Sequence, residues 1–180
     1  VRGIRVGAAS LGVRARARDD LLVFEMAPGA STVATFTRNA FCAAPVHLSR
    51  EHLAGASARY LVVNAGNANA GTGVAGMAAA RRVCELVASA SGCHTNEVLP
   101  FSTGVIGEVL NTVPFEQAVP SAIAELREDD WLRASRAILT TDIVAKGVSR
   151  SYRVHGQEHV ITGIAKGSGM ICPNMATMLA

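Results

Sequence analysis

The sequence predicts a layered α/β (α+β) sandwich, in which mixed sheets are flanked by helices. Short β-branched apolar runs and amphipathic stretches alternate irregularly along the 180 residues, and this order disfavours a regular doubly wound fold. No internal repeat, low-complexity stretch or linker divides the chain, so we expect one unit. Apolar residues make up 49% and charged residues 17% of the chain, which indicates extensive buried surface.

Five segments have the apolar, β-branched composition of strands: 20–27, 31–37, 59–66, 97–107 and 150–167. The first two flank "PGA", a pattern typical of two strands joined by a tight turn. The fourth is expected to turn at Thr103-Gly104. The last predicts a hairpin around Gly156.

Three segments are predicted to be helical. "VAGMAAARRVCELVASAS" (74–91) places its apolar residues at helical spacing and its charged residues on the other side. Residues 113–129 contain Pro120, which predicts a kink or two short helices. Residues 129–139 form a further helix, with Asp129 or Asp130 as its N-cap.

Composition disfavours several classes of protein. The net charge is only +3, and the one arginine cluster, at residues 14–18, has no interleaved aromatic residues, so we expect no nucleic-acid partner. No apolar stretch is long enough to span a membrane and the N-terminus lacks a hydrophobic signal core, so we expect a cytoplasmic protein without a membrane partner. The four cysteines and five histidines are dispersed without metal-ligand spacing, which favours reduced thiols and no metal.

The segment "NAGNANAGTG" (64–73) follows a predicted strand and precedes a predicted helix. Glycines at such a junction let backbone N–H groups converge on a phosphate, which would suit a non-enzymatic nucleotide-binding module. The segment matches no standard phosphate-binding motif and contains no lysine. A turn whose asparagines cap their own backbone explains it as well.

Two further segments combine hydroxyl groups with backbone donors or charge. In "STGVIG" (102–107), the Thr103 hydroxyl and the Gly104 N–H stand side by side and would suit an oxyanion hole, although a strand-to-turn junction explains them equally. In "LTTDIVAK" (139–146), two threonines and an aspartate would bind substrate hydroxyls or carboxylates, or simply end the preceding helix.

The segment "GIAKGSGMICPNMATM" (163–178) holds Lys166 beside a glycine-rich backbone and Thr177 after a small alanine. A threonine is a poor nucleophile unless a base activates it, and the α-amine of an N-terminal threonine can serve as that base. An unperturbed α-amine has a pKa of about 8, suited to general base catalysis near neutral pH. This use requires cleavage of the Ala176–Thr177 bond. A threonine inside a strand is the simpler alternative.

Taken together, these motifs resemble the ornithine acetyltransferase family, also called glutamate N-acetyltransferase. The matching pieces follow the family order and span most of the chain: "TFTRNAFCAAPV" (35–46), "NAGNANAGTG" (64–73), "STGVIG" (102–107), "AILTTD" (137–142) and "AKGSGMICPNMATML" (165–179). The last is the most specific. The mechanism of the family is more distantly related to that of self-cleaving aminopeptidases with N-terminal nucleophiles.

The resemblance implies a precursor that cuts itself between Ala176 and Thr177 into an α and a β chain. Thr177 would then take the acetyl group from N-acetylornithine and pass it to glutamate in arginine biosynthesis. By motif position, Thr103 and Gly104 correspond to the oxyanion hole. Thr140 and Lys166, with Thr177, correspond to substrate-binding positions.

The same resemblance implies how the chain is divided and with what it assembles. Residues 1–176 correspond to the α-chain portion, a single unit, and residues 177–180 to the start of the β chain. The β chain would be the partner in an α2β2 heterotetramer, active only with a free Thr177 amine. No cofactor is implied, although some members accept acetyl-CoA as co-substrate. A self-processing amidase or aminopeptidase is the alternative within the same mechanistic class.

Overall fold

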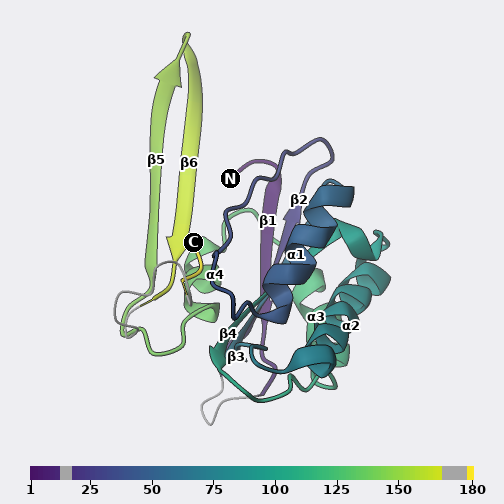
Figure 1. Ribbon diagram of the computed structural model, residues 1–180. Helices are drawn as coiled ribbons and strands as arrows, with labels where there is room; N and C mark the ends of the chain where they lie inside the picture. The colour runs from purple at the N-terminus through teal and green to yellow at the C-terminus, as the bar shows by residue number, and fades with distance from the viewer. Residues whose placement is uncertain (13–17, 168–177) are drawn as a thin grey trace.

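The computed structural model describes residues 1–12, 18–167 and 178–180. Its elements follow one another in the order shown in Figure 1. They are β1 (Ile4–Ala9), β2 (Leu21–Met26), α1 (Ala44–Gly55), β3 (Tyr60–Asn67), α2 (Gly73–Ser91), a 3-10 turn (Thr95–Glu97), β4 (Val98–Val105), α3 (Phe115–Ala124), α4 (Trp131–Ala137), β5 (Lys146–Val154) and β6 (Gln157–Ala165).

Strands β1 to β4 form one mixed sheet, in that order across the sheet. The pairs β1–β2 and β2–β3 are antiparallel, whereas β3 and β4 are parallel. A parallel pair needs a crossover connection, and α2 supplies it. The parallel arrangement brings the carboxyl ends of β3 and β4 to the same edge of the sheet. The predicted mixed sheet with flanking helices is confirmed.

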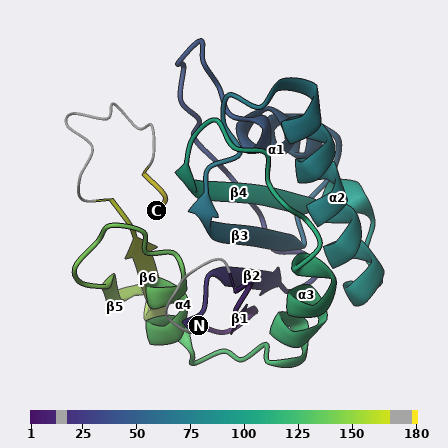
Figure 2. The ribbon, with the colours of Figure 1, turned by 90° about the horizontal axis from the view of Figure 1, so that it is seen from below.

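Helices α1, α2 and α3 lie together on one face of this sheet (Figure 2). Alternate residues of β2 point to opposite faces of the sheet. Leu21 and Val23 pack against the helices in the helix-side core, whereas Leu22 packs on the other face in a second cluster with α4. The helix-side core contains fully buried residues from every layer: Leu21, Val23, Leu48, Val62, Val87, Val98, Phe115 and Val119. Burial of each such side chain contributes about 1.5–3 kcal/mol before entropy is counted.

Helix α1 also covers the outer edge of β4. Ser49 Oγ donates to the Pro100 carbonyl at 2.9 Å, and His52 Nδ1 lies 2.7 Å from the Val98 carbonyl oxygen. Both carbonyls would otherwise be exposed ladder groups on an edge strand. The helix therefore satisfies the edge of the strand that carries Thr103.

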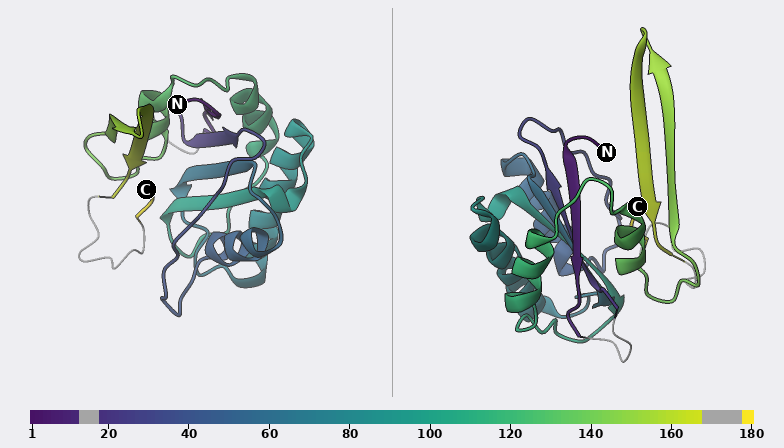
Figure 3. Two further views of the ribbon diagram at one scale, coloured as in Figure 1. Left: turned by 90° about the horizontal axis from the view of Figure 1, so that it is seen from above. Right: turned by 180° about the vertical axis from the view of Figure 1, so that it is seen from behind.

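Strands β5 and β6 form a separate two-stranded antiparallel sheet that projects from the body (Figures 1 and 3). They pair from Lys146↔Ala165 to Val154↔Gln157. His155 and Gly156 close the hairpin with φ of 49° and 78°, the left-handed pair that a tight two-residue turn requires. The hairpin predicted around Gly156 is confirmed, although β5 begins earlier than expected.

One predicted strand is wrong, and one observed strand and one observed α-helix were not predicted. Residues 31–37 form no strand, because both edges of β2 are already occupied by β1 and β3. The segment instead runs irregularly and lines a cavity through Thr35, Phe36 and Thr37. Strand β1 and helix α1 had no counterpart among the predicted elements.

The predicted helices are largely confirmed. Residues 74–91 lie within α2. Pro120 lies inside the single helix α3, so the alternative of two short helices is wrong. Asp130 occupies the N-cap position of α4 without a side-chain capping bond. Its carboxylate lies 3.7 Å from Arg133 instead, an ion pair one turn into the helix.

Candidate functional site

Strand β4 continues through Thr103 and Gly104 to Val105, so the turn expected there is wrong, and position 104 has no room for a side chain. Gly104 has φ 138°, and a Cβ there would lie 2.2 Å from the carbonyl carbon of Gly66 on β3. The residue must therefore be glycine for steric reasons of the sheet itself. Thr103 is buried beside it, on the strand that α1 supports.

The asparagines of "NAGNANAGTG" bond within their own surroundings. Asn64 Nδ2 donates to the Asn67 carbonyl at 2.8 Å, Asn67 Nδ2 to the Glu108 carbonyl at 3.0 Å, and Asn69 Nδ2 to the Gly76 carbonyl at 2.8 Å. These bonds tie the end of β3 to the start of α2 and to the segment after β4. The geometry matches the expected self-capping turn and gives no support to a nucleotide-binding loop.

Lys166 brings together three residues that the sequence analysis singled out. Its ammonium donates to Thr103 Oγ1 at 3.0 Å and to Thr140 Oγ1 at 2.7 Å. Thr103 comes from β4, Thr140 from the loop after α4, and Lys166 from the position just after β6. Lys166 is only 4% exposed and Thr103 is also buried, whereas Thr140 is partly exposed at the edge of the cluster.

The loop that carries Thr140 is fixed from both sides. Before it, Arg18 Nη2 donates to the Leu139 carbonyl. After it, the Asp142 carboxylate accepts the Gly167 N–H at 2.8 Å and the Lys146 ammonium at 2.6 Å through the same oxygen, Oδ1. The loop is thereby tied to the foot of the hairpin.

Asp142 is the charged residue of this site to which the sequence analysis gave no individual role. Its side chain is fully buried, and Oδ2 lies 4.0 Å from Lys166 Nζ. Burial by itself raises the pKa of this carboxyl, but hydrogen bonds from Lys146 and from the Gly167 and Thr140 backbone outweigh it and lower the pKa to about 2. The carboxylate is therefore ionised at neutral pH. In the sequence, its presence in the segment "LTTDIVAK" beside Thr140 was the only signal available, because its contact with Lys166 depends on the folded chain.

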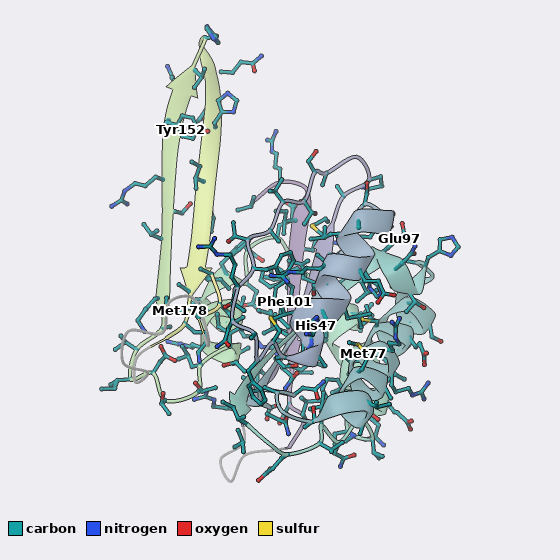
Figure 4. All side chains as sticks on the ribbon, viewed as in Figure 1. His47, Met77, Glu97, Phe101, Tyr152 and Met178 are labelled. Carbon is teal, nitrogen blue, oxygen red and sulfur yellow. The ribbon has the colours of Figure 1, made fainter. Side chains whose placement is uncertain are left out.

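A cavity of about 680 Å³ opens beside Thr103. Its wall combines the sheet face opposite α1–α3 with the irregular segment before α1 and with the last three residues of the chain. Phe101 and Met178, labelled in Figure 4, both line it. Aromatic and aliphatic side chains dominate the wall, and Thr103 and Ser102 are among its few polar groups, as in most small-molecule pockets.

The expected nucleophile Thr177 and the expected cleavage position at Ala176 lie outside the described residues. The described residues on either side of this segment meet at Lys166. The Lys166 N–H donates to the Leu179 carbonyl at 2.9 Å, which forms an isolated antiparallel bridge. The chain on the far side of Thr177 is thus joined to the residue that contacts Thr103 and Thr140.

The described residues contain neither a metal-binding cluster nor a membrane-spanning helix. Across residues 1–12, 18–167 and 178–180, no group of three or more His, Cys, Asp or Glu side chains is arranged to hold a metal ion. Within the same ranges, no helix has both the length and the apolar character needed to cross a membrane. Cys42, Cys84 and Cys93 are free thiols.

A family model described as the ArgJ family matches residues 5–180. The chain belongs to the ArgJ family. It is 52% identical over 179 residues to the arginine biosynthesis bifunctional protein ArgJ of Psychrobacter arcticus, covering 99% of this chain and 44% of that protein. It is 53% identical over 180 residues to the protein of the same name from Methylococcus capsulatus, covering 100% and 44%. The chain thus spans less than half the length of these ArgJ relatives.

Two solved ArgJ-family structures have the same fold. ArgJ of Bacillus halodurans is 31% identical, with a TM-score of 0.83, over 99% of this chain and 92% of that chain. Ornithine acetyltransferase of Mycobacterium tuberculosis, complexed with ornithine, is 32% identical, with a TM-score of 0.84, over 96% and 92%. The expected layered fold of the ornithine acetyltransferase type is confirmed, as is the family to which the sequence motifs pointed.

Proposed function

We propose that this chain forms the α-side portion of an ornithine acetyltransferase, which moves the acetyl group of N-acetylornithine to glutamate. The observation that carries the proposal is the buried contact of Lys166 with Thr103 and Thr140 in a chain of the ArgJ family. The ornithine complex of the M. tuberculosis relative supports ornithine-type substrates. The cavity beside Thr103 supports a small-molecule site.

In the proposed mechanism, the Thr177 hydroxyl attacks the acetyl carbonyl of N-acetylornithine while the Thr177 α-amine accepts its proton. The tetrahedral intermediate collapses with departure of ornithine, which takes a proton, and leaves an acetyl ester on Thr177. Glutamate then attacks that ester with its amine, so that N-acetylglutamate leaves and the Thr177 hydroxyl is restored. One nucleophile serving two acyl transfers predicts ping-pong kinetics.

The geometry around Lys166 suits stabilisation of the oxyanion in both steps. An ammonium can only donate hydrogen bonds, so Thr103 and Thr140 accept from Lys166 through their oxygens. Each hydroxyl therefore keeps its own hydrogen to donate. In the proposal, Thr103 gives that hydrogen to the developing oxyanion together with the Gly104 N–H. Thr140 and Lys166 contact the substrate on this side of the site.

Cleavage between Ala176 and Thr177 is part of the proposal, because only a cut chain has a free Thr177 amine. The lengths of the related proteins support this cleavage. The chain covers 92% of each crystallised chain but only 44% of each curated relative, so the crystallised relatives contain chains far shorter than the full proteins. A β chain from the same precursor, an α2β2 assembly and a cytoplasmic location complete the proposal. Light scattering of the purified protein tests the assembly.

The test uses the purified full-length gene product. We expect intact-mass analysis to find a break between Ala176 and Thr177, and labelled acetyl to pass from N-acetylornithine to glutamate. The variant Thr177→Ala should remain uncut and transfer no acetyl group. The matched variant Thr162→Ala, altered on the hairpin, should be cut and active. An uncut active wild type would overturn the mechanism.

The same assay separates the alternatives. A self-processing amidase or aminopeptidase would release free acetate or amine in place of N-acetylglutamate. Replacing N-acetylornithine by acetyl-CoA tests whether that thioester is a second donor. The proposed steps use Thr177 and backbone or side-chain donors of the protein, so we expect full transfer after dialysis against a chelator.

A further inference from the structure

We propose that Asp142 is a positioning residue for acetyl transfer, which holds the Lys166 ammonium against Thr103 and Thr140. The proposal rests on the proposed function of the site. In this proposal Asp142 does not touch the substrate. Its action runs through Lys166, whose two hydroxyl partners lie at the end of β4 and in the loop after α4.

The first support is electrostatic. Lys166 is 4% exposed, and an ammonium buried to that extent is costly without an opposite charge nearby. Asp142 Oδ2 lies 4.0 Å from Lys166 Nζ, and its side chain is itself fully buried. Within the described residues, Oδ2 has no hydrogen-bond partner, so its charge is available to the ammonium beside it.

The second support is geometric, because Asp142 also binds the backbone next to Lys166. Its Oδ1 accepts the Gly167 N–H at 2.8 Å. The Lys166 N–H is engaged on the other side by the Leu179 carbonyl. One carboxylate therefore restrains both the side chain and the following peptide of the lysine that contacts Thr103.

The third support is the balance of charge in the cluster. Asp142 also binds Lys146, whose side chain is 42% exposed, through Oδ1 at 2.6 Å. The Lys146 ammonium therefore reaches the carboxylate from the exposed side, while the buried Lys166 ammonium and the buried Asp142 carboxylate balance each other's charge. Lys146 binds Oδ1, whereas Oδ2 is the oxygen that faces Lys166.

The first test is kinetic and uses the full-length protein. Asp142→Asn keeps an acceptor for the Gly167 N–H but removes the charge. We expect kcat for acetyl transfer to fall by about 10- to 100-fold with KM within about threefold, because the loss of orientation affects the transition state. Asp130→Asn, which alters a partly exposed ion pair of α4, is the matched control and should keep both constants. An unchanged kcat in Asp142→Asn would overturn the proposal.

The second test is a double-mutant cycle with Lys166→Met. If Asp142 acts through Lys166, the double variant should be no slower than Lys166→Met alone. Multiplying losses would show that Asp142 acts independently and would overturn the proposal.

Thermal unfolding of the wild type, the two single variants and the double variant keeps the proposal testable if a single variant folds poorly. Removing one member of a buried pair leaves an uncompensated charge, so Asp142→Asn should unfold at a lower temperature than the double variant. A double variant less stable than both singles would contradict the pairing. This readout does not depend on activity. A wild type without acetyl transfer would therefore sink the proposed function, while the unfolding cycle would still decide whether Asp142 and Lys166 act as a pair.

Discussion

The four-stranded sheet and the β5–β6 hairpin are built on opposite principles. The sheet is buried under α1, α2 and α3, and residues such as Leu21, Val23 and Leu48 have no exposed surface. The hairpin projects from the body, and most of its side chains are exposed, including Ile161 at 62%. Packing holds the first region, whereas a ladder of backbone bonds and a tight turn hold the second.

The hairpin nevertheless has two chemically different faces. Directly paired residues share a face, so Arg150↔Ile161 and Tyr152↔His159 lie on one side. The rings of Tyr152 and His159 stack there at 5.4 Å between centroids. On the other side, Ser149 and Thr162 are joined through their hydroxyls at 2.8 Å. Cross-strand pairs of this kind stabilise each rung by less than about 1 kcal/mol.

The candidate site lies where these two regions meet. Thr103 belongs to the rigid sheet, and Lys166 follows the last strand of the hairpin. Only the foot of the hairpin is partly buried, where Asp142 ties it to the loop after α4. The hairpin therefore contributes its end to the site, and we expect its exposed length to be energetically almost independent of the sheet.

The largest effect on stability is expected from the sheet side. Leu48 of α1 is fully buried in the helix-side core, and Leu48→Ala should lower the free energy of unfolding by about 2–5 kcal/mol, because a cavity adds to the lost burial. Urea unfolding of the full-length protein measures this. A loss under about 1 kcal/mol would mean that α1 is not part of the cooperative core, and the contrast between the regions would fail.

A middle-sized effect is expected at the junction, and it depends on pH. The pKa of Asp142 is lowered from 3.8 to about 2 in the folded state. Its negative charge therefore stabilises the fold at pH values above the unfolded-state pKa. That contribution, about 2 kcal/mol, should disappear as pH falls from about 4 to about 2. Urea unfolding across this range should show that the free energies of unfolding of wild type and Asp142→Asn approach each other as the pH falls. A difference that is constant with pH would show that the Asp142 charge contributes nothing.

Sequence patterns predicted those parts of the fold in which local signals and tertiary contacts agree. Residues 74–91 form a helix as expected, because their apolar face is also the face that packs on the sheet. Residues 31–37 alternate like a strand, but β2 has no edge left to pair with them. Helix α1 has weak signals of its own and is fixed by bonds from Ser49 and His52 to β4, which no local pattern reveals.

The candidate site was predicted through family motifs rather than through spacing. Thr103 and Lys166 are 63 residues apart, and nothing in composition places one against the other. Motif positions singled out both, and the structure brings them within hydrogen-bond distance. The same motifs gave no role to Asp142, because its importance comes from burial between two lysines, which depends on the folded chain. The contacts of Lys166 are observed, but the roles of Thr103, Gly104, Thr140, Lys166 and Thr177 in acetyl transfer stay predictions.

The smallest effect on global stability is expected in the hairpin, where backbone and side-chain contributions can be separated. The Lys166 N–H points to Leu179 and away from β5, so by alternation the N–H of Val160 also points away, whereas that of Ile161 faces Arg150. Ile161→Ala and Val160→Pro should each change the free energy of unfolding by under about 0.5 kcal/mol. Ile161→Pro removes a donor of the ladder and should open the hairpin.

Amide hydrogen exchange of the full-length protein distinguishes these outcomes residue by residue. Protection of β5 should be lost in Ile161→Pro and kept in Val160→Pro, while protection of β3 should be unchanged in both. The two prolines differ by one position and one direction of the N–H group, so they serve as each other's control. If Ile161→Pro also lowers protection in β3, the hairpin and the sheet unfold together. The hairpin would then be a cooperative part of the core, despite its exposed side chains.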